Sequence, residues 1–197
     1  MKVCGRKAVF LDRDGTIIED RGHLSNPDDV IFYPYTLKAL KILQKDFLLF
    51  IVSNQSGIAK KLITKEDVDK VNARVIDILR KNGIEITQIY YCPHNREDNC
   101  ECIKPKPYFL RKAVEKYGID LSKSYVIGDH PHDVEFAENA GAKGIYVLTG
   151  HGAKHTNELK PGWIVAKNLL EASEMISRYG LQPVPVLGCN KAKNGTA

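Results

Sequence analysis

Three cysteines and one histidine lie close together in the stretch CPHNREDNCECIKPKP, which runs from Cys92 to Pro107. Cys92, His94, Cys100 and Cys102 make a Cys₃His set, a common ligand set of structural zinc sites. Four protein ligands leave no open position for water or substrate, so we predict a structural zinc ion and not a catalytic one. Cysteines that are close by chance remain an alternative, as does a redox pair, although the stretch contains no C-x-x-C spacing.

Acidic and polar side chains follow three apolar runs of the sequence. Asp12 and Asp14 lie in DRDGTI, Ser53 opens SNQSG, and Asp129 and Asp133 bracket the turn in GDHPHD. Taken alone, the first pair could be two solvated acids in a turn. Together these side chains could hold a magnesium ion through carboxylates and a phosphate through hydroxyl, amide and backbone donors.

Five short runs of continuous apolar residues predict strands that are buried on both faces, as in a parallel sheet. They are Ala8 to Leu11, Phe47 to Val52, Ile86 to Tyr91, Tyr125 to Gly128 and Gly144 to Leu148.

Amphipathic segments between these runs predict helices, most of them ending at a glycine. They are Tyr35 to Gln44, Thr64 to Lys81, Tyr108 to Tyr117, Val134 to Ala140 and Leu169 to Tyr179. Alternating strands and helices predict a doubly wound α/β fold, in which ligands bind at the carboxyl ends of the strands. We expect one domain over residues 1–180, with the zinc loop at 92–107, and a flexible tail over 181–197.

Composition excludes several classes of protein. The chain has 197 residues, 43% of them hydrophobic and 27% charged, and a net charge of +5. Basic and acidic residues are interleaved, which does not favour nucleic-acid binding, and no apolar run is long enough to span a membrane. Five cysteines in a chain without a predicted signal peptide argue against a disulfide framework. We expect a cytoplasmic protein, a monomer or a small homo-oligomer.

The motifs occur in an order that resembles the haloacid-dehalogenase-like phosphohydrolases. FLDRDGTI is similar to the first family motif, Ser53 to the second, Lys104 to the third and GDHPHD to the fourth, over roughly residues 8 to 150. Within this family, the sequence resembles most the branch of heptose bisphosphate phosphatases and histidinol-phosphate phosphatases. That branch has the same NQSGIA stretch and a similar Cys/His loop. About 50 residues separate Ser53 from Lys104, too few for a large cap domain.

The resemblance implies a role for each motif residue. Asp12 would be the nucleophile and Asp14 the general acid and base, while Ser53 and Lys104 would hold the phosphoryl oxygens. Magnesium would bind to the carboxylates of Asp12 and Asp129 and to the backbone carbonyl of Asp14, with Asp133 beside them. Substrate contacts are expected from a further set of residues: Arg13, Asp20, Arg21, Gly22, His23, Asn54, Gln55, Ser56, Ile103 and His130.

Three positions depart from this branch, one of them His23, where an aromatic residue is common. Ile103 stands where an arginine usually precedes the motif lysine, and His130 stands where a lysine usually follows the motif aspartate. An arginine fork recognises a second phosphate far better than an apolar side chain does. We therefore expect the residues that cleave a phosphoester to be complete, and we expect specificity for a bisphosphate to be weakened. Four histidines, His23, His132, His151 and His155, are expected to lie at the surface.

We therefore expect a magnesium-dependent phosphomonoesterase that forms a phosphoaspartate. Its first expected substrate is D-glycero-D-manno-heptose 1,7-bisphosphate or a related sugar phosphate, and histidinol phosphate is the alternative. A non-catalytic binding module with a zinc-stapled loop is the alternative from another class.

Overall fold

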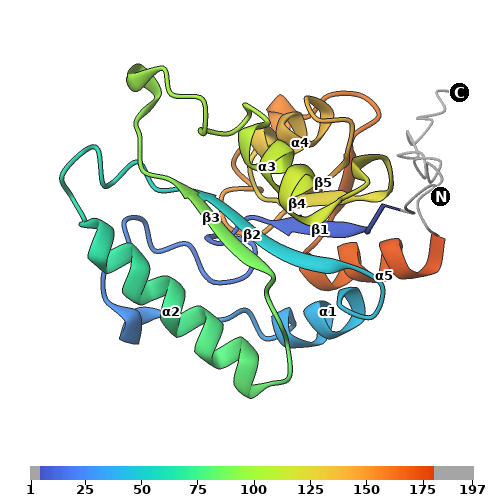
Figure 1. Cartoon of the computed structure of the whole chain (residues 1–197), viewed down its shortest axis with the longest axis horizontal. Helices are drawn as coiled ribbons and strands as arrows, with labels where there is room; N and C mark the ends of the chain where they lie inside the picture. Colours follow the sequence, from blue (N-terminus) through green and yellow to red (C-terminus); the bar gives the residue numbers. More distant parts are fainter. Residues whose placement is uncertain (1–4, 180–197) are drawn as a thin grey trace, which may run out of the picture.

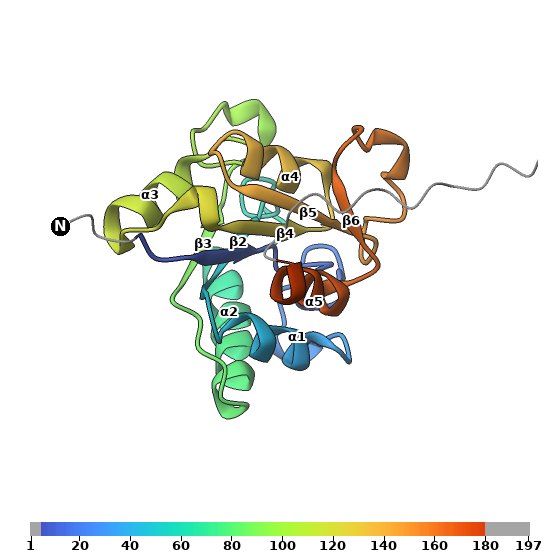
Figure 2. The same ribbon diagram turned by 90° about the vertical axis from the view of Figure 1, so that its right-hand side faces the viewer.

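The computed structural model describes residues 5–179, which form a six-stranded parallel sheet with helices on both faces (Figures 1 and 2). The strands are β1 (Ala8–Leu11), β2 (Leu48–Asn54), β3 (Gln88–Cys92), β4 (Tyr125–Gly128), β5 (Lys143–Val147) and β6 (Ile164–Ala166). The helices are α1 (Thr36–Leu43), α2 (Lys65–Lys81), α3 (Tyr108–Tyr117), α4 (Pro131–Glu138) and α5 (Leu169–Tyr179). The predicted tail over 181–197 lies outside the described residues.

The strand order is β3-β2-β1-β4-β5-β6. From β1 the chain first adds β2 and β3 on one side, and it then returns to add β4, β5 and β6 on the other side of β1. The strand next to β1 on one side is β2 and on the other is β4, and the crevice at such a reversal is where doubly wound sheets bind ligands. This confirms the predicted fold class.

Two apolar layers form the core, because successive side chains of a strand point to opposite faces of the sheet. Val9 and Leu11 pack with α1, α2 and α5, whereas Ala8 and Phe10 pack with α3 and α4. Figure 2 shows the two groups of helices on opposite sides of the sheet. Side chains from all four of these β1 positions are fully buried, which explains why the run is continuously apolar.

Helix α4 begins at Pro131, three residues before the predicted start at Val134. Pro131 occupies the first turn, where its missing N–H is not needed, and Asp133 caps the helix by accepting a hydrogen bond from the His130 backbone. The turn between Asp129 and Asp133 in GDHPHD is therefore formed by the N-cap and the first turn of the helix.

Strand β6 was not predicted. It has three residues, and its central residue Val165 is 36% exposed at the edge of the sheet. A strand this short carries too little periodicity to be recognised in sequence. Residues 5–179 include no helix with both the length and the apolarity needed to cross a bilayer.

Candidate active site

A cavity of about 250 Å³ opens at the carboxyl ends of β1, β2 and β4. Its lining residues come from the ends of these strands, the loop after β1, the zinc loop, helix α4 and the loop after β5: Asp12, Asp14, Asp20, Gly22, His23, Asn54, Gln55, Ser56, Arg96, Lys104, Asp129, His130, His132, Asp133 and His151. The structure thus brings residues from distant parts of the chain to one edge of the sheet.

Lys104 is the centre of the charge network in this cavity. Its Nζ atom donates hydrogen bonds to Asp12 Oδ1 at 2.5 Å, to Asp133 Oδ1 at 2.6 Å and to the carbonyl oxygen of Val52 at 3.0 Å. Only 5% of the lysine is exposed. Although burial opposes its charge, Asp12 and Asp133 raise the pKa of Lys104, so the amine is a permanent cation.

Three carboxylates surround this one lysine. Burial, together with the charges of Asp133 and Asp14, raises the pKa of Asp12 to about 7 against the opposing effect of Lys104. Burial and the charges of Asp12 and Asp133 raise the pKa of Asp129 to about 8. Three ionised carboxylates and one ammonium leave two negative charges (−3 + 1 = −2). One Mg²⁺ would neutralise them, and oxygen ligands suit that ion.

Asp129 is held by a backbone hydrogen bond and by the close approach of a glycine. The Asp129 Oδ2 atom accepts a hydrogen bond from the His151 N–H at 2.7 Å. Gly15 has φ of 81°, and a Cβ atom there would lie 2.0 Å from Asp129 Oδ2. Gly15, in the DRDGTI motif, is therefore needed both for its left-handed backbone and for the space that Asp129 occupies.

Asp14 is oriented separately from the other carboxylates. It pairs with the Arg13 guanidinium (Nη2 to Oδ2, 2.9 Å) and accepts a hydrogen bond from Gln55 Nε2 at 2.9 Å. Arg13 is fully buried and also donates to Asn72 of α2 at 2.8 Å. A carboxylate held in this way at the cavity wall suits proton transfer to and from a bound group.

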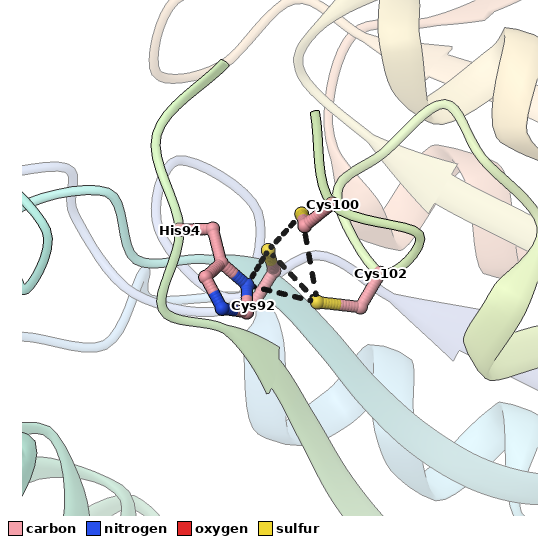
Figure 3. A group of neighbouring side chains, drawn as sticks. All are labelled: Cys92, His94, Cys100 and Cys102. Atoms are coloured by element: carbon pink, nitrogen blue, oxygen red, sulfur yellow. Dashed lines mark hydrogen bonds between the residues drawn. The ribbon is translucent and has the colours of Figure 1, made fainter. Parts of the chain in front are cut away.

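The predicted zinc ligands converge (Figure 3). The ligand atoms of Cys92, His94, Cys100 and Cys102 all lie within 4.8 Å of one another, and the three thiols are free. The Sγ of Cys92 is 3.5 Å from that of Cys100 and 3.2 Å from that of Cys102, and His94 Nδ1 lies 3.3 Å from Cys102 Sγ. In a tetrahedral zinc site with Zn–S bonds of ~2.3 Å these edges are roughly 3.6–3.8 Å. The set therefore fits a tetrahedral metal ion.

The zinc loop is connected directly to Lys104. Cys92 ends β3, and Ile103, between Cys102 and Lys104, packs in the apolar layer beside Cys92. The Lys104 backbone N–H donates to Asn54 Oδ1 at 3.1 Å. The loop is thus attached to the ends of two strands, which sets where the Lys104 side chain enters the cavity.

The predicted substrate contacts divide into two groups. Asp20, Gly22, His23, Asn54, Gln55, Ser56 and His130 line the cavity. Four other predicted site residues do not: Arg13 is buried behind Asp14, Ile103 is in the apolar layer, Arg21 is exposed, and Ser53 is buried with its Oγ 3.3 Å from Gln55 Nε2.

Comparison with known proteins agrees with this geometry. A family model described as HAD-hydrolase-like matches residues 101–172. A D-glycero-beta-D-manno-heptose-1,7-bisphosphate 7-phosphatase of Haemophilus ducreyi is 39% identical over 165 residues, which are 79% of this chain and 91% of that protein. This chain belongs to the haloacid-dehalogenase-like phosphatases. It is therefore a phosphatase, and phosphatases of this kind act on small phosphorylated molecules.

Two further relatives define the branch of this phosphatase. The crystal structure of D,D-heptose 1.7-bisphosphate phosphatase from B. bronchiseptica, complexed with magnesium and phosphate, has a TM-score of 0.80 and 30% identity, covering 86% of this chain and 97% of that one. The histidine biosynthesis bifunctional protein HisB of Blochmanniella floridana is 37% identical over 143 residues, 71% of this chain and 40% of that protein.

Sequence reasoning missed three residues that line the cavity of this phosphatase: Arg96, His132 and His151. Both histidines lie at the surface as expected, His151 exposed and His132 partly buried, but both also line the cavity, which was not expected. His132 stacks on His130 with 4.5 Å between ring centroids, and His151 Nε2 lies 3.0 Å from Asp20 Oδ2. The spacing of His130 and His132 in the first turn of α4 was an available signal, whereas nothing local to Arg96 pointed to the cavity.

The raised pKa values predict a pH-dependent stability of the magnesium-free, zinc-loaded protein. A carboxyl group whose pKa is raised from about 3.9 in the unfolded chain stabilises the fold at low pH, and that contribution is lost as the pH rises through the folded value. For Asp12 and Asp129 the loss spans about pH 4 to 8. Asp129→Asn removes one such group and should flatten the decline of Tm over this range by up to roughly 3 °C per pH unit.

Differential scanning calorimetry of both proteins between pH 5 and 8.5, without magnesium or chelator, measures this difference. Asp77→Asn is a matched control because it changes a carboxylate on the exposed side of α2. Identical slopes for the wild type and Asp129→Asn would contradict the assignment of raised pKa values to this site.

Proposed function

We propose that this phosphatase hydrolyses the 7-phosphate of D-glycero-D-manno-heptose 1,7-bisphosphate with magnesium and through a phosphoaspartate. The observation that carries the proposal is the group of Asp12, Asp129 and Asp133 around Lys104 in one cavity at the strand ends. The similarity to heptose bisphosphate phosphatases over most of the chain supports the substrate.

Phosphoryl transfer can be assigned to the residues as follows. A carboxylate oxygen of Asp12 attacks phosphorus, and the bond to the leaving sugar oxygen breaks while Asp14 donates a proton to that oxygen. Asp14, now ionised, takes a proton from water, whose oxygen attacks the phosphoaspartate and releases phosphate. Lys104 stabilises the negative charge on the phosphoryl oxygens throughout.

Magnesium would be held by the carboxylates of Asp12 and Asp129 and the backbone carbonyl of Asp14, with Asp133 alongside. When bound, the ion neutralises charge on the phosphoryl group and the nucleophile. Ser53 is assigned to the phosphoryl group as well, a role that requires its buried hydroxyl to turn from Gln55 toward the cavity.

Zinc would be held by Cys92, His94, Cys100 and Cys102 and would have a structural role. It fixes the loop that ends at Lys104 and so positions the lysine between its two carboxylates. No open ligand position remains in this set, so the ion takes no part in the chemistry. We place the enzyme in the cytoplasm, as a monomer or small homo-oligomer.

Histidinol phosphate is the second candidate substrate, supported by the similarity to HisB. Both candidates are phosphomonoesters, and the cleavage residues described above serve either one. They differ at the end of the molecule away from the scissile bond, where one carries a phosphate and the other an imidazole and an amine.

Asp12→Asn tests the mechanism. We expect kcat to fall by at least about 10³-fold on every phosphoester, since the nucleophile is lost, while the zinc content and the circular dichroism spectrum stay the same. Side-by-side kcat/KM values of the wild type on heptose 1,7-bisphosphate and histidinol phosphate choose between the substrates. Retained turnover in Asp12→Asn would refute the phosphoaspartate, and a higher kcat/KM on histidinol phosphate would reverse the substrate assignment.

Cys102→Ser tests the zinc site. Elemental analysis of wild-type protein should give one zinc per chain, and the variant should lose most of it and about 3 kcal/mol or more of stability. Cys189→Ser changes a cysteine outside the ligand set and should retain the metal. Wild-type protein without zinc and with all five cysteines titrating as free thiols would contradict the proposal.

A further inference from the structure

Arg96 differs from the other permanent cation that lines the cavity. Lys104 bonds to two carboxylates, whereas Arg96 makes no ion pair with any carboxylate of residues 5–179. Among residues 5–179, the side-chain hydrogen bonds of its guanidinium go only to His132, whose ring nitrogens Nδ1 and Nε2 lie 2.8 and 3.1 Å from Arg96 Nη2. An unpaired guanidinium beside an imidazole has most of its hydrogen-bond donors available.

The position of Arg96 is fixed from both sides. It begins the short 3-10 helix Arg96–Asp98 of the zinc loop, two residues after His94, and the turn is closed by Asp98 Oδ2, which accepts from the Asn95 N–H at 2.7 Å. On the other side, His132 is stacked against His130 with an interplanar angle of 6°. Arg96 is an exposed side chain, and its place in this loop and its hydrogen bond to His132 put the guanidinium at the rim of the cavity.

The charges of the cavity indicate what Arg96 can bind. Lys104 bonds to Asp12 and Asp133, Arg13 pairs with Asp14 and His151 lies beside Asp20, so no carboxylate of the described lining is paired with Arg96. Arg96 is left at the rim beside histidines. A guanidinium fork matches the geometry of phosphate oxygens and binds them through paired charge-assisted hydrogen bonds. An anionic group of the substrate at this rim would provide the missing partner.

We propose that Arg96, held by His132, binds a second phosphate group of the substrate, so that this phosphatase selects small molecules with two phosphates. The inference rests on the proposed function, because it assumes that the first phosphate lies between Asp12 and Lys104 in the same cavity. It also accounts for Ile103, which stands where related phosphatases usually have an arginine before the motif lysine. The Ile103 side chain is only 9% exposed and packs with the apolar layer, whereas Arg96 is an arginine of the same loop that lines the cavity.

The experiment compares two substrates that differ only in the second phosphate: heptose 1,7-bisphosphate and heptose 7-phosphate. The wild type should favour the bisphosphate, and Arg96→Ala should lower the ratio of the two kcat/KM values by at least about tenfold, mostly through KM for the bisphosphate. Arg96→Lys keeps the charge without the fork and should retain part of the ratio. Arg80→Ala is the matched control. Arg80 is also an exposed arginine, but it lies beside a separate recess, which Leu48 at the start of β2 also lines.

Calorimetric binding of both compounds in an Asp12→Asn background with magnesium tests the subsite independently of turnover. Adding Arg96→Ala to that background should weaken binding of the bisphosphate far more than binding of the monophosphate. Zinc content and Tm of each variant establish that the loop is intact.

Three outcomes would overturn the inference: a wild type that does not distinguish the two compounds, an Arg96→Ala variant that retains the wild-type ratio, or one that weakens both compounds equally, as a purely structural contact to His132 would. Absence of magnesium-dependent hydrolysis of every phosphoester is a different result. It contradicts the proposed function, and the binding measurements still decide the subsite.

Discussion

The buried contact of Lys104 with Asp12 and Asp133 is the interaction on which the rest of the site depends. A buried ammonium is expensive unless carboxylates and hydrogen-bond acceptors surround it, and removal of one partner leaves an uncompensated buried charge. The lysine comes from the loop before α3, whereas its partners come from β1 and α4. This pairing therefore holds three separate segments of the chain at one point on the edge of the sheet.

In our proposal, a zinc ion supports that contact. The loop between β3 and α3 contains only a short 3-10 helix, and a metal ion that binds four of its side chains would replace a hydrophobic core over so short a segment. Two side chains of this loop line the same cavity, Lys104 at the reacting end and Arg96 at the rim. In our proposal, a zinc ion bound in this loop would influence both the rate and the choice of substrate without contacting either phosphate.

The local charge balance explains why the site suits a magnesium ion and a phosphoester together. The carboxylates exceed the paired cations by two charges, and the elevated pKa values of Asp12 and Asp129 express the cost of burying that excess. A divalent cation removes this cost. A phosphoryl group can then approach Asp12 without repulsion from carboxylates whose charge is not neutralised.

The sequence by itself determined the fold class, the four zinc ligands as a cluster and most of the carboxylates at the strand ends. These features depend on periodicity and on spacing within one short segment, which are local properties. Only the tertiary structure decided that Ile103 is core and that Arg96 and His132 share the rim of the cavity. Arg96 and His132 are 36 residues apart, and the sequence around neither residue indicates a contact with the other. Their contact exists because parallel strands end at the same edge, which brings the loops after them together.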